Sequence, residues 1–285
     1  MIEGHIMARS YGILFIAILL LISSHTFAQT KEIAITIDDL PFVGTTHNKP
    51  GNLRREKERF MRIVDSLNKH QVTATGFVVA GTIEQDQWSL LEAFKDTGSV
   101  IANHTYTHLN LNTNNADRYI SDIAKADKVL EPLMSGTKFF RYPYLAEGKG
   151  QKKEEVRNYL LENKYVIAPV TIDSKDFKFN ARLLNVNWRS RQNHIPSIKR
   201  QYLNYMWRQT ERAERKAGDK PIKQILLIHA NYLNSYAMDD IIQMYKDKGY
   251  TFITLEEALE DNQAQVIEVS TKPKPEEEKE ESSWF

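Results

Sequence analysis

The sequence predicts an α/β fold, a distorted (β/α) barrel of about seven parallel strands. Two observations lead to this prediction. Short apolar, β-branched segments alternate along the chain with longer segments of helical periodicity, and this alternation is typical of a parallel sheet covered by helices. Titratable residues also fall at or just beyond the carboxyl ends of several predicted strands, and that rim carries the functional groups of (β/α) barrels.

Each predicted strand is a run of mostly apolar or β-branched residues that is bounded by turn or helix signals. In chain order the strands are 32–37, 73–80, 99–102, 138–142, 165–172, 224–228 and 251–255. Their near-continuous apolar character indicates burial on both faces, as in a sheet with helices on its outside. Seven βα units fit a closed or nearly closed barrel better than an open sheet.

Helical patterns fill the intervals between these strands. The predicted helices are 53–69, 88–96, 117–133, 152–163, 197–217 and 236–248. Gly98 and Gly249 follow two of them, at the position where a helix commonly ends in the left-handed conformation. Asp117 and Asp239 stand at turns or helix starts.

The two ends of the chain are expected to lie outside the folded domain. Residues 11–22 are apolar, follow Arg9 and precede a small-residue segment that ends at Ala28, which predicts a signal peptide over 1–28. The apolar run is shorter than the ~20 residues of a typical membrane span, so an uncleaved anchor is the second interpretation. The folded domain is then 29–262, and residues 263–285 form a charged tail that is expected to be disordered. The expected location is periplasmic or secreted.

Composition excludes several classes of protein. The chain has no cysteine, so disulfides cannot stabilise it. Its formal net charge is +1, and the signs are balanced, so we expect no nucleic-acid partner. After removal of the signal peptide, no membrane span is predicted.

Two short motifs predict a metal site. The first strand ends in Asp38-Asp39, and the third is followed by His104-Thr-Tyr-Thr-His108. Two histidines at this spacing can share an ion from one helix face or around one turn, and Asp39 is a candidate third ligand. The alternative is a pair of surface or core histidines. One carboxylate with two imidazoles suits zinc, and cobalt, nickel or iron would fit the same donors. Asp38 is then placed to act as a base toward a water molecule.

Five motifs in order resemble those of the NodB-type polysaccharide deacetylases, carbohydrate esterase family 4. They are Thr36-Ile-Asp-Asp39, His104-Thr-Tyr-Thr-His108, Arg141-Tyr-Pro-Tyr144, Asp173-Ser-Lys-Asp-Phe177 and Leu227-Ile-His229. The resemblance extends over roughly residues 30–260. Three positions depart from the family pattern: Leu40 replaces a glycine, Leu145 follows the third motif instead of a glycine, and Phe177 replaces a tryptophan.

The resemblance assigns roles to further residues. Arg141 would orient Asp38, as its charge beside two adjacent carboxylates also suggests. His229 would be the general acid, with Asp176 as its partner and Asp173 as a neighbour. The backbone N–H of Tyr144, after Pro143 in the substrate-binding motif, would help bind an oxyanion.

The resemblance implies metal-dependent removal of N-acetyl or O-acetyl groups from a polysaccharide, with an N-acetylglucosamine-containing glycan as the expected substrate. Two alternatives stay open. One is a cyclic-amide or ureide hydrolase on the same fold. The other is a catalytically degenerate barrel that binds glycan without cleaving it.

Residues 182–221 combine basic and aromatic side chains, and this combination has two interpretations. An acidic glycan would suit both kinds of group. An amphipathic helix with its aromatic face on the barrel and its charges in water would give the same pattern. The residues concerned are Trp188, Arg189, Arg191, Lys199, Arg200, Tyr202, Tyr205, Trp207, Arg208, Arg212, Arg215 and Lys216.

Overall fold

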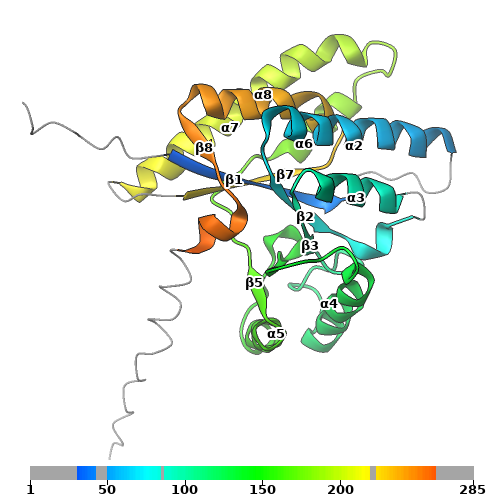
Figure 1. The fold of residues 1–285 in the computed structure, drawn as a ribbon, viewed down its shortest axis with the longest axis vertical. Coiled ribbons are helices and arrows are strands. Elements are labelled where there is room, and N and C mark those ends of the chain that lie inside the picture. The colour runs from blue at the N-terminus through cyan, green and yellow to red at the C-terminus, as the bar shows by residue number, and fades with distance from the viewer. Residues whose placement is uncertain (1–30, 43–49, 85–86, 219–222, 261–285) are drawn as a thin grey trace, which may run out of the picture. The chain divides into compact units, whose positions relative to one another are not determined.

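The computed structural model describes residues 31–42, 50–84, 87–218 and 223–260, which fold around a single parallel sheet (Figure 1). The predicted signal peptide, 1–28, and the predicted charged tail, 263–285, lie outside the described residues. None of the helices in the described ranges is long and apolar enough to cross a membrane.

The sheet is a half-barrel in which every strand pair is parallel. Seven strands follow the order β5-β4-β3-β2-β1-β7-β6, and the short strand β8 pairs with the beginning of β1. This arrangement confirms the predicted barrel of about seven strands. The bounds are β1 Lys31–Leu40, β2 Ala74–Val78, β3 Val100–Asn103, β4 Lys138–Phe140, β5 Tyr165–Ile167, β6 Ile172–Asp173, β7 Lys223–His229 and β8 Tyr250–Phe252.

The barrel is open between β5 and β6, where the sequence predicted one strand over 165–172. That prediction was wrong, because β5 pairs with β4 whereas β6 pairs with β7 at the other edge of the sheet. Pro169 lies between them and has no N–H to donate to a ladder. The carbonyls of Ala168 and Pro169 instead accept hydrogen bonds from Arg141, at 3.4 and 3.1 Å. Ala168 and Thr171 still donate to the carbonyls of Phe140 and Ile225, at 2.8 and 3.1 Å, so the chain leaves the edge strands only at Pro169 and Val170.

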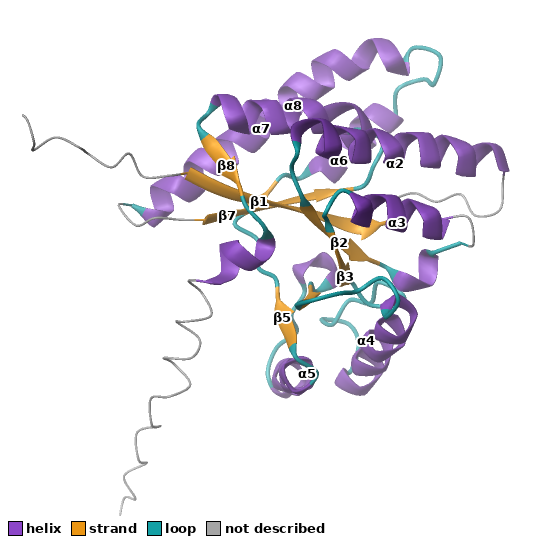
Figure 2. Ribbon diagram, viewed as in Figure 1, coloured by secondary structure: helices purple, strands orange, loops and turns teal. Residues whose placement is uncertain are grey.

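The helices lie outside the sheet, as Figure 2 shows. All six predicted helices are present, α3 with the predicted bounds and the others with at least one end shifted, and α6 was not predicted. Helix α7 also begins six residues before the predicted start at 197, because Pro196 lies in its second turn and does not precede it. The bounds are α2 Pro50–His70, α3 Trp88–Asp96, α4 Ala116–Leu130, α5 Gln151–Glu162, α6 Asp176–Leu184, α7 Arg191–Ala217 and α8 Asn234–Asp247, with the short helices η1 Ala80–Thr82 and η3 Pro143–Leu145.

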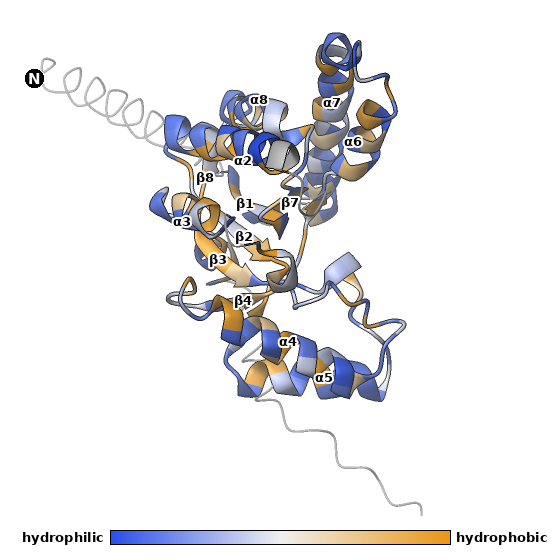
Figure 3. Ribbon diagram, turned by 90° about the vertical axis from the view of Figure 1, so that its right-hand side faces the viewer, coloured by the Kyte–Doolittle hydropathy of each residue, from blue (hydrophilic) through white to orange (hydrophobic). Residues whose placement is uncertain are grey.

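The two faces of strand β1 pack against different parts of the structure. Ile33, Ile35 and Ile37 pack in the cluster that includes residues of α2 and α8. Ala34 belongs to a second cluster with residues of the neighbouring strands, closed by Leu255, Ala258 and Leu259. Figure 3 shows the contrast between the apolar strands and the largely hydrophilic outer surfaces of the helices. Since side chains alternate along a strand, Thr36 and Asp38 follow Ala34 on the inner face.

Candidate active site

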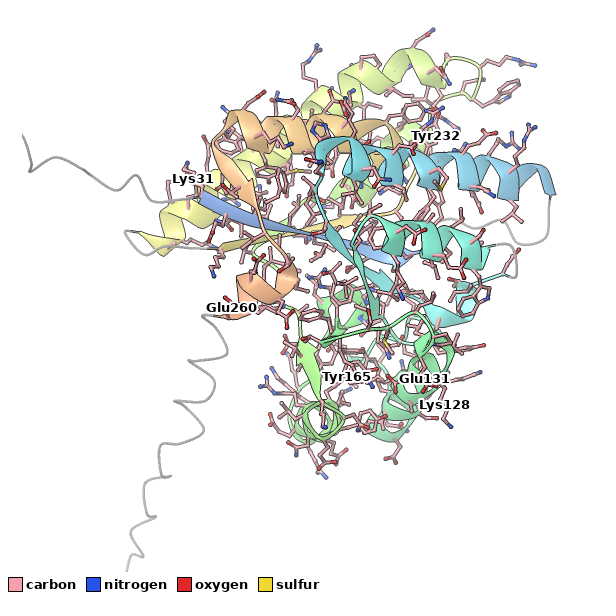
Figure 4. All side chains as sticks on the ribbon, viewed as in Figure 1. Lys31, Lys128, Glu131, Tyr165, Tyr232 and Glu260 are labelled. Carbon is pink, nitrogen blue, oxygen red and sulfur yellow. The ribbon has the colours of Figure 1, made fainter. Side chains whose placement is uncertain are left out.

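The predicted metal ligands converge at the carboxyl ends of two strands. Asp39 is the penultimate residue of β1, and His104 directly follows β3. His108 comes from the same loop, so the two histidines meet around a turn and not on a helix. One donor atom from each of Asp39, His104 and His108 lies within 4.8 Å of the others. Figure 4 shows Tyr232, three residues after His229, far from Lys31 at the start of β1, which places this rim at the opposite end of the sheet.

The surroundings and the lowered pKa of Asp39 fit a site for a bound cation. Its Oδ1 lies 3.1 Å from Nε2 of His108 and 3.5 Å from Nε2 of His104. The same oxygen is buried and has no partner in hydrogen-bond geometry among the described residues. Burial alone would raise the pKa of Asp39, but His108, His104 and His229 outweigh it and hold that pKa below its usual range. Three donors of the N and O type around one point are what a divalent transition metal requires.

An irregular backbone brings the two adjacent aspartates to one side of the sheet. In a regular strand Asp38 and Asp39 would face opposite sides. The pairing of β1 with β2 shifts register between Ile37 and Leu40, and Asp39 has a left-handed φ of 62°. Both carboxylates consequently approach His104, whose Nε2 is 3.8 Å from Asp38 Oδ2. Leu40, which replaces the family's glycine, is fully buried beyond this irregularity.

The ring of His104 is held in the orientation that a ligand needs. Its Nδ1 lies 2.8 Å from the carbonyl oxygen of Arg141. A carbonyl can only accept, so Nδ1 carries the proton and the lone pair of Nε2 faces Asp39. Burial lowers the pKa of His104 despite the raising effect of Asp38 and Asp39. The ring is therefore neutral, which is the state that binds metals.

Arg141 crosses the barrel interior to reach Asp38. Its guanidinium is 1% exposed and packs 4.3 Å over the ring of Phe77. Nη1 donates to Asp38 Oδ1 at 2.8 Å and to Thr36 Oγ1 at 2.6 Å. The pairing fixes one oxygen of Asp38 and leaves Oδ2 facing the metal donors. Arg141 thus orients both Asp38, through its side chain, and His104, through its carbonyl.

Two residues that the sequence did not reveal hold the histidine loop. Asn103 Oδ1 accepts the N–H of Thr105 at 2.8 Å, and its Nδ2 donates to the carbonyl of Ile123 at 3.2 Å. Asp122 of α4 accepts the N–H groups of Tyr106 and Thr107 at 3.0 and 2.9 Å. The loop needs this support because Thr105 and His108 have φ of 66° and 57°, which non-glycine residues rarely adopt. Asn103 could have been noticed beside His104, whereas Asp122 carries no signal in the sequence.

Removal of the Asp122 carboxylate should weaken metal binding. Asp122→Ala leaves two backbone N–H groups without their acceptor and frees the loop between His104 and His108. We expect the affinity for Co²⁺ to fall by about 10–100-fold, as is usual when groups that orient metal ligands are lost. Titration with Co²⁺, followed by visible absorption, measures the change. Asp117→Ala, on the same helix and exposed, is the matched control, and an equal loss in both variants would contradict the role of Asp122.

On the other side of the site, His229 is bound to a buried carboxylate. His229 ends β7, and its Nδ1 lies 2.7 Å from Oδ1 of Asp176 at the start of α6. Asp176 Oδ2 accepts from the N–H of His229 at 2.7 Å and from the amides of Asn231 and Asn234 at 2.8 and 2.6 Å. Asp176 is therefore anchored as an anion, and Nε2 of His229 is the ring nitrogen left to exchange a proton. No sequence motif pointed to the two asparagines.

Asp176 controls the protonation of His229. Burial lowers the pKa of this ring, but Asp176, with Asp39 and Asp38 as smaller contributors, raises it to about 10. A cation bound at Asp39 would oppose that rise in the pKa of His229. A general acid works only below its pKa, and Asp176→Asn removes the largest raising effect while burial persists. The pH above which activity is lost should therefore move downward in Asp176→Asn, as a pH profile of kcat would show. An unchanged alkaline limb would contradict this assignment.

The remaining predicted residues line the rim. Pro143 is buried, and Tyr144 follows with a left-handed φ of 59° and a 65% exposed side chain whose ring is 4.5 Å from that of His108. Phe177 is 49% exposed, and its ring lies edge-on at 6.4 Å from that of His229. Asp173 binds Lys175 at 2.5 Å and forms no hydrogen bond or ion pair with His229.

Comparison with known proteins identifies the family. The family model for polysaccharide deacetylase matches residues 27–167. The chain is 30% identical over 148 residues to the peptidoglycan-N-acetylglucosamine deacetylase of Bacillus cereus, and the alignment covers 52% of this chain and 46% of that protein. The chain belongs to the polysaccharide deacetylase family, as its five motifs predicted. It spans about half the length of that curated relative.

Solved structures share the fold. A peptidoglycan N-acetylglucosamine deacetylase is 24% identical with a TM-score of 0.56, and the match covers 80% of this chain and 88% of that one. A family 4 acetyl xylan esterase from Clostridium thermocellum, in complex with a cobalt ion, is 20% identical with a TM-score of 0.53, and covers 80% of this chain and 90% of that one. At these identities the likeness concerns the fold alone.

Proposed function

We propose that this protein is a metal-dependent hydrolase that removes N-acetyl groups from an N-acetylglucosamine-containing polysaccharide and releases acetate. One observation carries the proposal: the donors of Asp39, His104 and His108 gather at the rim where Asp38 and His229 stand side by side, in register across β1 and β7. Asp38 is a buried carboxylate held by Arg141, and His229 is an imidazole held by Asp176. The name of the Bacillus cereus relative supports the same reaction and substrate class.

The protein's own residues account for the proton transfers. A divalent cation bound by Asp39, His104 and His108 would polarise the amide carbonyl and make water a stronger nucleophile. Oδ2 of Asp38 accepts the proton of the attacking water, because Arg141 occupies Oδ1. Nε2 of His229 donates a proton to the leaving amine, since its Nδ1 is bound to Asp176. The backbone N–H of Tyr144 binds the developing oxyanion.

Zinc is the proposed ion, because two imidazoles and one carboxylate form an open site of the kind that zinc uses in hydrolases. Cobalt, nickel and iron suit the same donors, and the cobalt in the acetyl xylan esterase structure is in keeping with this range. Metal analysis of the purified protein would identify the ion that it carries.

Export is part of the proposal. The apolar run 11–22 and the small residues up to Ala28 support a signal peptide over 1–28, followed by a catalytic domain over 29–262 and a charged tail over 263–285. The mature protein would act in the periplasm or outside the cell. Cell fractionation, with sequencing of the amino terminus of the recovered protein, tests this part of the proposal.

Acetate release tests the reaction. The purified protein is incubated with N-acetylglucosamine oligomers, peptidoglycan and acetylated xylan, each with and without a chelator. Release that the chelator abolishes and added metal restores is the expected result, and acetylated xylan separates ester from amide cleavage. An absence of acetate release despite a bound ion would favour a non-sugar amide substrate. Retained glycan binding without turnover would favour the degenerate, glycan-binding alternative.

A further inference from the structure

Helix α7 and the segment around β6 enclose a basic groove away from the metal donors. The groove has a cavity of about 440 Å³. Six residues of α7 line it, and the four larger ones stand at the spacing i, i+4, i+7 and i+11, so they form one stripe of the helix. We call it the α7 groove, and the side chains that matter are Tyr205, Gln209, Arg212 and Lys216 of α7 with Asp173 and Lys175 opposite.

The positive charges of the α7 groove are not neutralised within it. Its acidic side chain, Asp173, is already engaged, because Oδ2 binds Lys175 Nζ at 2.5 Å and Oδ1 accepts the N–H of the same residue at 3.0 Å. In the part of the chain that the structure describes, neither Arg212 nor Lys216 forms a salt bridge, and Arg212 donates only to Gln209, at 3.4 Å. The groove therefore offers two cations to an outside anion.

The glutamates of α7 are engaged elsewhere. Glu211 accepts a hydrogen bond from Trp207 Nε1 at 2.9 Å. Glu214 binds Lys31 at 2.9 Å and accepts from the hydroxyl of Tyr250 at 2.6 Å. Neither residue lines the α7 groove. Neither glutamate therefore neutralises Arg212 or Lys216 on the groove side of the helix.

An aromatic ring accompanies the cations. Tyr205 is half-buried and lines the groove, with its ring 5.6 Å from that of Phe179. Tyr202 of the same helix is instead fully buried in the core. The aromatic residues of α7 therefore divide between packing and the groove, and the amphipathic packing predicted for segment 182–221 accounts for Tyr202 but not for the position of Tyr205. A ring beside cations suits a sugar that carries an acidic group.

Lys175 and Phe177 connect the α7 groove to the neighbourhood of His229. Lys175 lines the groove, and its Nζ lies 5.8 Å from the ring centre of Phe177. The exposed Phe177 in turn lies beside His229, with a ring separation of 6.4 Å. A polymer that places one residue at the metal donors could thus extend past Phe177 toward Arg212 and Lys216.

We propose that the α7 groove binds a carboxylate of the polysaccharide, so that the substrate is an acidic glycan in which carboxylated units accompany the N-acetylated sugars. The inference rests on the proposed function, since it specifies the substrate class of that site. Arg212 and Lys216 pair with the carboxylate, and Tyr205 packs against the sugar that bears it. The groove determines specificity and takes no part in the proton transfers.

Binding to two matched oligosaccharides tests the inference. Hyaluronan oligomers carry N-acetylglucosamine and a carboxylated sugar, whereas chitin oligomers of equal length carry N-acetylglucosamine alone. Calorimetric titrations use the Asp38→Asn variant, because its slowed turnover leaves the oligosaccharides unchanged while binding is measured. The groove variant Arg212→Gln/Lys216→Gln is compared with Arg208→Gln/Arg215→Gln, which removes the same charge from exposed positions of α7 outside the groove. Each titration is repeated at high salt.

We expect the groove variant to bind hyaluronan oligomers about tenfold more weakly, with chitin binding unchanged and the control pair near the parent protein. Each ion pair at a partly exposed site contributes modestly to the binding free energy, and two such pairs together can account for a tenfold change in affinity. High salt should reduce the difference. Equal losses in both double variants, or no preference for hyaluronan over chitin, would overturn the inference. Acetate release from chitin by the groove variant with Asp38 intact separates this failure from failure of the proposed function.

Discussion

Asp38→Asn is expected to lower the rate constant for acetate release by about 10²–10⁴-fold, the usual contribution of a positioned general base. The asparagine can still accept the hydrogen bond that Arg141 donates to Oδ1. It cannot take a proton from water at Oδ2. Because the metal donors are Asp39, His104 and His108, the variant should still take up metal. Rate measurements on N-acetylglucosamine oligomers, with metal analysis of the same samples, give both quantities.

Asp39→Asn is the matched control, since it changes the adjacent carboxylate in the same way. It should lose metal affinity, and with it activity, because Asp39 Oδ1 is the oxygen that faces both histidines. The two aspartates are then distinguished by metal content and not by rate. If Asp38→Asn also released the metal, Asp38 would be a ligand and its assignment as base would fail.

Arg141→Leu is expected to lower the free energy of unfolding by about 3–5 kcal/mol, because it leaves the Asp38 carboxylate buried without its cation. The guanidinium also donates to Thr36 and to two backbone carbonyls, so its loss leaves several acceptors unpaired. Urea unfolding followed by circular dichroism measures the change. Arg54→Leu, which breaks a pair with Glu58 at 3.8 Å on the surface, should cost under about 1 kcal/mol.

A double variant separates the charge effect from the loss of packing. Arg141→Leu/Asp38→Asn removes both charges, so it should be more stable than the sum of the two single changes predicts. Strict additivity would mean that Arg141 stabilises the barrel through its packing on Phe77 and its bonds to Thr36 and the two carbonyls, and not through its charge pair with Asp38. In that case its orienting effect on Asp38 would need a different explanation.

Much of the fold could be predicted because its signals are local. The apolar runs of β1 and β7 and the periodic pattern of α3 depend only on neighbouring residues, and these elements lie where they were expected. The strand predicted over 165–172 was wrong for a non-local reason. After β5 the chain passes to β6 at the other edge of the sheet, and Arg141 binds the carbonyls of Ala168 and Pro169 between them; no local pattern reports such contacts.

By itself the sequence determined the family and the donor types, because motifs such as His104-Thr-Tyr-Thr-His108 combine chemistry with spacing. Only the tertiary structure decided how those groups meet. The left-handed turn at Asp39 brings two adjacent carboxylates to one side, and Asp122, far along the chain, holds the histidine loop. The same holds for the α7 groove, where Arg212 and Lys216 face Lys175. The physical reason is that these contacts join residues distant in sequence, and their geometry follows from packing the whole sheet and its helices.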